Sequence, residues 1–285
     1  MNQKLILLLV FITSVNLFLI GLIKTNQKMP SVVKSPVVLP PPPSILERTQ
    51  VGPSKLIPKF ENYPPVRSVN NLGKVLSDTE SHLPAGHIYY DEDKITCVHE
   101  GTHGINSNAR IKFFNNKKIN AFYVLENRVV VIEEPNTRIK IVANKIPNSL
   151  RGEVYNLYLV QQASSWDDTP LYILDEWSAY VNGSACRLDL GIQNRSETVR
   201  YMLEFNVYSS CVAWCSGTND PQLKAFLMWQ IERAIKIYKD SGTLGNLHTS
   251  DDYLDKMRKN GDSLEWRIFC QQYFGADWCK EVLGF

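Results

Sequence analysis

The stretch "KITCVHEGTHGINSNAR", residues 94–110, contains two histidines and a glutamate in the spacing His-Glu-x-x-His. In an α-helix His99 and His103 lie one turn apart on the same face, so both imidazoles can reach one metal ion at about 2.0–2.1 Å. Glu100 projects from an adjacent face, where a carboxylate can hold a water molecule and accept its proton. The stretch therefore predicts a helix that carries two ligands and the general base of a zinc site.

Chance is a poor explanation of this spacing. The chain has five His and fifteen Glu among 285 residues, and a random arrangement would give about 0.005 matches to His-Glu-x-x-His. The simpler interpretation is a pair of helix histidines that make ordinary hydrogen bonds. The zinc interpretation needs a third protein ligand from elsewhere in the chain.

A third histidine is excluded in the extended form of the motif. It would stand six residues after the second one, where the chain has Ala109, and Asn106 replaces the glycine of that pattern. Glu176 is the strongest carboxylate candidate, because it stands in "LDEWSAYVNG" (174–183), an otherwise apolar helix, where a carboxylate is costly to bury unless it is paired or binds a metal. In the alternative, Glu176 faces solvent at a helix edge. Asp175 is the next candidate, and weaker ones stand at helix starts or in polar loops: Glu153, Asp167 and Asp168.

His-Glu-Gly-Thr-His, followed by a helix that reads Glu-aromatic-x-Ala, resembles the gluzincin branch of the zincin metallopeptidases. The resemblance covers these two short segments. It implies that His99, His103 and Glu176 bind Zn²⁺ and that Glu100 is the general base. Two features depart from the family pattern. Tyr180 stands where many gluzincins have an aspartate, and Glu176 follows His103 by 73 residues, with predicted strands between them.

The aspzincins, which also use His-Glu-x-Thr-His, are an alternative branch. The stretch "SGTNDP" at 216–221 has the aspartate of their second motif but lacks the Tyr-Gly that should follow. A peptidase of either branch also needs a hydrogen-bond donor for the oxyanion. Three side chains are candidates for this donor: Tyr172, Tyr180 and His248.

The resemblance implies a zinc-dependent metallopeptidase that hydrolyses peptide or protein substrates with a zinc-activated water. The alternative is a catalytically inactive zincin-like protein that is tethered to a membrane and binds partners. A third interpretation is a structural protein with an accidental motif. Nearly equal basic and acidic counts, with a net charge of +2, exclude a strong electrostatic attraction to nucleic acid. The sequence does not indicate an oligomeric state.

A long apolar run lies near the N-terminus. Residues 5–23, "LILLLVFITSVNLFLIGLI", carry no charge and lie between Lys4 and Lys24. At about 1.5 Å per residue such a run can just span a bilayer core of roughly 30 Å. It is longer than the ~7–15 apolar residues of a signal peptide, and no Ala-x-Ala pattern follows it. We therefore expect a short tail at 1–4 and a transmembrane signal-anchor at 5–23.

The next segment, residues 24–64, is rich in proline, which favours an extended polyproline conformation. We expect a stalk there, with a proline-motif ligand as the alternative, and a zincin-like domain at 65–285. Lysines flank the anchor on both sides, so the positive-inside rule does not orient it. The sequons at Asn182 and Asn194, and an even number of cysteines, favour an extracellular or lumenal body with disulfides over a cytosolic one with free thiols. The six cysteines are Cys97, Cys186, Cys211, Cys215, Cys270 and Cys279.

Hydrophobic periodicity predicts an α+β body, with a small β-sheet followed by a helical C-terminal half. A hydrophobic content of 44% is ample for its core. Runs rich in β-branched and aromatic residues predict strands at 110–114, 119–125, 128–134 and 138–144. Apolar residues at helical spacing predict helices at 151–164, 170–183, 197–215, 220–239 and 262–274.

Overall fold

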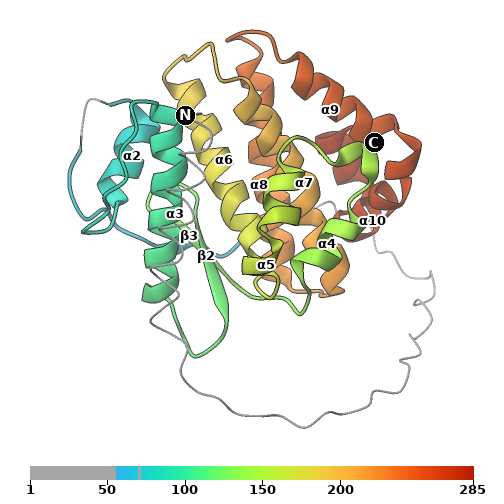
Figure 1. The fold of residues 1–285 in the computed structure, drawn as a ribbon, viewed down its shortest axis with the longest axis horizontal. Helices are drawn as coiled ribbons and strands as arrows, with labels where there is room; N and C mark the ends of the chain where they lie inside the picture. Colours follow the sequence, from blue (N-terminus) through green and yellow to red (C-terminus); the bar gives the residue numbers. More distant parts are fainter. Residues whose placement is uncertain (1–55, 70–71) are drawn as a thin grey trace. The chain divides into compact units, whose positions relative to one another are not determined.

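The computed structural model describes residues 56–69 and 72–285. They form an α+β fold, in which one small antiparallel sheet is surrounded by helices (Figure 1). The expected anchor at 5–23 lies outside the described residues, as does most of the expected stalk. Among the described helices, none combines the length and the apolar character that a bilayer crossing requires.

The sheet has the strand order β1-β3-β2. Strands β2 (Ile119–Tyr123) and β3 (Arg128–Glu133) pair antiparallel and confirm two of the expected strands. The turn between them is unusual, because Leu125, Glu126 and Asn127 all have positive φ. These values cost conformational energy in non-glycine residues. The cost is offset by contacts from outside the turn, including a hydrogen bond of 3.1 Å from the Glu126 N–H to the Asp78 carboxylate.

The third strand corrects the expected boundary of the body. Strand β1, Glu61–Asn62, pairs with β3, and the neighbouring Tyr63 is buried. Both lie in the stretch expected to be stalk. The folded part of the chain therefore begins before residue 65.

Two of the expected strands are wrong. Helix α3 (Lys94–Lys112) continues through most of 110–114, and 138–144 falls in helix α4 (Ile139–Lys145). The run at 138–144 is rich in β-branched residues, which favours a strand locally. Its helix is started instead by Asp167, distant in sequence, which accepts the Ile139 N–H through its carbonyl and the Lys140 N–H through its carboxylate. A tertiary contact thus overrides the local preference.

The expected helices in the C-terminal half are present, although the one expected at 151–164 is divided into a π-helical turn and a short helix. Two further helices were not expected, one before the motif helix and one near the C-terminus: α2 (Lys74–His82) and α9 (His248–Lys259). The other helical elements are η1 (Asn148–Leu150), η2 (Asn156–Gln161), α5 (Ala163–Trp166), α6 (Tyr172–Asp189), α7 (Glu197–Ser216), α8 (Pro221–Ser241), η3 (Gly261–Ser263), α10 (Leu264–Phe274), α11 (Ala276–Trp278) and η4 (Cys279–Leu283).

Helix α6 lies at the centre of the fold and contacts α3, α7, α8 and β2 (Figure 1). Its side chains are buried on nearly every face, and Trp177, fully buried, donates a 2.9 Å hydrogen bond to Asn206 of α7. A helix surrounded in this way has no solvent side to which a polar residue can turn. Any carboxylate in its middle must therefore find a partner inside the protein.

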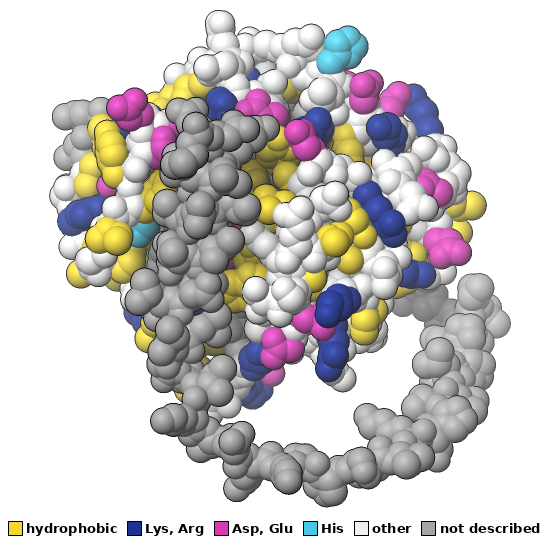
Figure 2. All heavy atoms as spheres, in the orientation of Figure 1, with side chains coloured by type: hydrophobic (Ala, Val, Ile, Leu, Met, Phe, Trp, Pro, Cys, Tyr) yellow, Lys and Arg dark blue, Asp and Glu magenta, His cyan; other side chains and the backbone are white. Residues whose placement is uncertain are grey.

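The cysteines and one sequon correct the expectations about processing. All six cysteines are free thiols, so the expected disulfides are absent from the structure. Asn182 is fully buried in α6, which closes the first sequon to glycosylation in the folded protein. Asn194 is exposed in the loop before α7. On the face shown in Figure 2, acidic and basic side chains are interspersed, as the small net charge suggests.

Glu134, directly after β3, fixes the start of the central helix. Its carboxylate accepts a 3.1 Å hydrogen bond from the N–H of Leu171, the N-cap residue of α6. Burial raises the pKa of Glu134 from its ordinary value of 4.5 to about 7. Between these two values the native protein holds a proton that the unfolded chain has released. The stabilisation from this group is therefore largest below pH 4.5 and declines as the pH rises to about 7.

We predict that Glu134→Gln, which resembles the protonated side chain, removes this dependence. The stability difference between Glu134→Gln and wild type should grow in favour of the variant as the pH rises from about 4.5 to 7. Urea unfolding at a series of pH values measures it. Glu133→Gln is the matched control, since Glu133 is the exposed last residue of β3, next to Glu134, and it should give a difference without this slope. A parallel response of the two variants would contradict the assignment to Glu134.

Candidate metal centre

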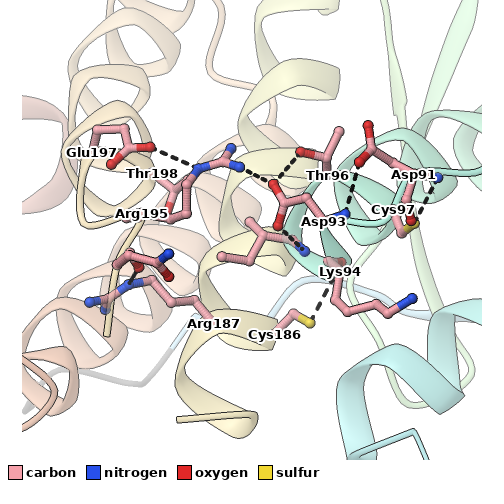
Figure 3. Close-up of polar contacts among 12 residues, drawn as sticks. Asp91, Asp93, Lys94, Thr96, Cys97, Cys186, Arg187, Arg195, Glu197 and Thr198 are labelled. Atoms are coloured by element: carbon pink, nitrogen blue, oxygen red, sulfur yellow. Dashed lines mark hydrogen bonds and ion pairs between the residues drawn. The ribbon is translucent and has the colours of Figure 1, made fainter. Parts of the chain in front are cut away.

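The N-cap residue of the motif helix, Asp93, contacts both the first turn of the helix and a loop distant in sequence (Figure 3). Asp93 accepts hydrogen bonds from the Ile95 N–H at 3.2 Å and from the Thr96 hydroxyl at 2.7 Å. Arg195, from the loop between α6 and α7, pairs with the same carboxylate. One turn into the helix, the Cys97 thiol donates to the carbonyl of Asp91 at 2.8 Å, so it serves packing and not the site. These contacts place the first turn of α3 relative to the loop that follows α6.

Helices α3 and α6 pack side by side and run antiparallel (Figure 1). Gly183 lies in this contact, where a Cβ would make ordinary van der Waals contacts, 3.4 Å from the Ile95 carbonyl and 3.8 Å from the His99 Cβ. Further along, Asn182 donates hydrogen bonds to the Thr102 hydroxyl at 3.1 Å and to the Tyr123 carbonyl of β2 at 3.0 Å. A buried amide therefore helps to fix the contact between the two helices.

This packing brings together His99, His103 and Glu176. The two Nε2 atoms are 3.2 Å apart, and Glu176 Oε2 lies 3.6 Å from His99 Nε2 and 3.5 Å from His103 Nε2. Ligands arranged as a tetrahedron around zinc, with bonds of about 2.0–2.1 Å, are about 3.3–3.4 Å apart. The three donor atoms thus have the spacing of one face of such a tetrahedron. The sequence-based choice of Glu176 over the other carboxylates is consistent with this geometry.

The surroundings of Glu176 also fit a bound cation. Its side chain has no exposed surface, and neither carboxylate oxygen has a hydrogen-bond partner among the described residues. Burying a charge without hydrogen bonds is strongly unfavourable unless an opposite charge or a metal compensates it. Burial acts to raise the pKa of Glu176, but the attraction of the two imidazoles outweighs it and lowers the pKa well below its ordinary value. The carboxylate is thus held ionised by the positive charge of its neighbours.

Asp175, the second candidate for the third ligand, lies on the far side of the His103 ring from Glu176. Its Oδ2 lies 3.3 Å from Nδ1 of His103, which directs Nε2 of that ring toward Glu176. Asn106 holds the carboxylate from α3 with its amide nitrogen, and its amide oxygen accepts the Tyr123 N–H of β2 at 2.6 Å. A carboxylate on the outer nitrogen of a ligand histidine fixes its tautomer and orientation.

Asn106 is a residue whose role the sequence did not reveal. In the sequence it stands only at the position where the extended form of the motif has a glycine. In the structure it connects the motif helix to α6 and to the sheet. It stands seven residues after His99, two turns along the same face of the helix. That spacing was the available signal.

Aromatic side chains form one wall beside the ligands. The Tyr180 ring packs edge-on against His99 with centroids 4.5 Å apart, and its hydroxyl lies 2.9 Å from that of Tyr158, on η2. Tyr172 donates to Gln162. Burial and the nearby Glu176 charge raise the pKa of all three phenols, so they stay protonated. Of the three oxyanion candidates, the structure places Tyr180 and Tyr172 beside Glu176, whereas His248 is exposed at the start of α9.

Glu100 is partly exposed on α3. Its carboxylate has no hydrogen bond or ion pair within the described part of the chain, which leaves it available to a water molecule. Successive residues of a helix are rotated by about 100°, so Glu100 points to the side of the His99–His103 face. The two imidazoles are 13% and 16% exposed while Glu176 is closed off, which shows that the centre opens on the side of α3.

The remaining carboxylate candidates are occupied elsewhere. Glu153 pairs with Arg200, Asp167 caps α4 as described, and Asp168 pairs with Lys118 at 3.1 Å. Asp220 is the aspartate of the alternative aspzincin motif. It is the N-cap of α8, where its carboxylate accepts hydrogen bonds from the N–H groups of Gln222 and Leu223. The aspzincin alternative therefore loses its proposed ligand.

Comparison with known proteins found no match among family models, curated proteins or solved structures. The chemistry of the centre is accordingly argued from its own geometry.

We predict that Glu176→Gln weakens Zn²⁺ binding by more than about 100-fold, because it removes one of three ligands. Asp175→Asn should weaken it by about 10- to 100-fold, the usual effect of losing the outer partner of a ligand histidine. Titration with a competing zinc chelator measures both. Asp168→Asn is the matched control, since this side chain is 81% exposed and belongs to no part of the centre. Equal affinities for all three variants would contradict the ligand assignment.

Proposed function

We propose that this protein is a zinc-dependent hydrolase of the zincin type and that its substrates are peptides or proteins. The observation that carries the proposal is the convergence of His99, His103 and Glu176 at spacings of 3.2–3.6 Å. The gluzincin resemblance suggested the same three ligands from two segments that are 73 residues apart in sequence. A chance motif gives no reason for a buried carboxylate without hydrogen bonds to lie at these two histidines.

A zinc ion held by the three ligands would polarise a substrate carbonyl and lower the pKa of a bound water to ~7. The protein's own groups have separate tasks. Glu100, free of other partners, accepts a proton from the attacking water and returns it to the nitrogen of the leaving amine. Asp175 holds the ring of His103 in the tautomer that presents Nε2 to the centre. The protonated Tyr180, packed on His99, limits the freedom of that ring.

We predict that Glu100→Gln retains zinc and loses peptide hydrolysis. Removing a general base lowers kcat by about 10²- to 10⁴-fold, while the three ligands stay in place. Metal analysis of the purified protein and a broad pool of fluorogenic peptides measure the two properties. Glu92→Gln, at an exposed glutamate just before the motif helix, is the control and should retain activity.

The competing function is that of a membrane-tethered binding protein on an inactive zincin-like scaffold. It would be favoured if the wild type bound zinc but cleaved nothing in the peptide pool. Failure to bind zinc at all would reject the enzyme and would also favour the inactive scaffold. The Glu100→Gln comparison therefore separates an enzyme from a binding protein that has the same metal centre.

We also propose that residues 5–23 anchor the chain in a membrane by a single pass and that the body is extracellular or lumenal. The support is the uncharged apolar run and the exposed sequon at Asn194. In a eukaryotic secretory system we predict glycosylation at Asn194 and not at the buried Asn182. A glycosidase-sensitive mass shift that Asn194→Gln abolishes is the expected result. A body that stays unglycosylated and is digested by protease outside sealed microsomes would place it in the cytosol.

A further inference from the structure

The segment His87–Tyr90, which leads into the motif helix, has the side-chain pattern of a strand without being part of the sheet. His87 and Tyr89 are partly buried, whereas Ile88 and Tyr90 are 95% and 74% exposed. Alternation of this kind means that successive side chains point to opposite sides of an extended backbone. One side of the segment is therefore held by the protein, and the other carries two large apolar groups into solvent.

The inward side chains attach the segment to α3. The His87 ring lies directly on Gly104, where a Cβ would be 2.7 Å from Nδ1 and 3.0 Å from Cε1. Tyr89 donates a 3.0 Å hydrogen bond to Asp91, which itself holds Cys97 of α3. Gly104 is thus required for the close approach of the segment to the motif helix.

This attachment places the segment on the open side of the metal centre. Gly104 stands one turn after Glu100 and lies on the same face of α3. Burial lowers the pKa of His87, which the Glu100 charge opposes, and burial raises the pKa of Tyr89, to which the Asp91 hydrogen bond and the Glu100 charge add. Glu100 and the segment His87–Tyr90 consequently lie on the same side of α3.

The backbone of the segment is free for pairing. Within the described residues, no hydrogen bond involves the backbone N–H or C=O groups of Ile88, Tyr89 or Tyr90. The outer strand of the sheet, in contrast, is closed where it approaches the centre, because Asn106 accepts the Tyr123 N–H and Asn182 donates to the Tyr123 carbonyl. An extended ligand at the centre would thus find unpaired backbone groups on the segment and not at this end of β2.

We propose that His87–Tyr90 is the substrate-binding strand of the centre: it pairs through its backbone with an extended peptide, and Ile88 and Tyr90 contact apolar side chains of that peptide. This inference rests on the proposed function, since Glu100 and the ligands define where the scissile bond lies. Addition of an extended peptide to an unpaired strand supplies affinity from the backbone, while alternate side chains supply selectivity. The substrate class is accordingly unfolded or extended polypeptide with apolar residues near the cleaved bond.

The test uses the zinc-loaded full chain in detergent and a pool of fluorogenic peptides. Ile88→Asp and Tyr90→Asp should each raise KM about tenfold, equivalent to about 1.4 kcal/mol, with zinc content and kcat unchanged. The same changes in a Glu100→Gln background should weaken binding of a labelled, uncleaved peptide by the same factor in fluorescence anisotropy. Ile268→Asp, at a 44% exposed isoleucine of α10, is the control and should change neither property.

Gly104→Ala provides an independent variant, since alanine favours the helix by about 1 kcal/mol while its Cβ displaces His87. It should raise KM, and adding Ile88→Asp should raise it little further. N-methylation of the peptide backbone should weaken binding to the wild type. If the wild type cleaves peptides but the variants keep its KM, the inference is overturned and the proposed function stands. If the wild type binds no zinc or cleaves no peptide, the proposed function fails and this inference fails with it.

Discussion

The constraint on which the structure depends is a carboxylate without hydrogen bonds in the middle of its central helix. Glu176 is fully buried, and its carboxylate lies 3.5–3.6 Å from the two imidazoles of α3. An ionised group in such a place destabilises the fold unless a positive charge compensates it. The packing of α3 against α6 is what brings that compensation within reach. The fold and the candidate metal centre therefore depend on the same contact.

Polar side chains with several partners determine how the parts of the centre are arranged. Asn106 contacts Asp175 on α6 and the backbone of β2, and Asn182 contacts α3 and the same strand. Buried amides of this kind are stabilising only when their hydrogen-bonding groups are satisfied in one particular arrangement. They therefore fix the register of the two helices against the sheet, which a purely apolar contact would leave more adaptable. The orientation of His103 follows from this register through Asp175.

The sequence predicted much of the fold, and its failures have identifiable physical causes. The central helices were predicted from apolar residues at helical spacing, and the β2–β3 hairpin from runs rich in β-branched and aromatic residues. The segment 138–144 was misassigned because Asp167, distant in sequence, supplies the cap that makes it a helix. The motif helix extends past its expected end, with Arg110 and Lys112 in its last turn, where basic side chains favour the helix.

The sequence by itself singled out two histidines, a candidate general base and the strongest carboxylate candidate, because the spacing of side chains on one helix is a property of local geometry. Only the tertiary structure decided that Glu176 faces them and that Asp175 lies behind His103, because neighbouring residues of α6 point in different directions until α3 is packed against it. The position of the segment His87–Tyr90 was equally hidden in the sequence. This position depends on a contact between His87 and Gly104, which are not close in the chain and which no local pattern connects.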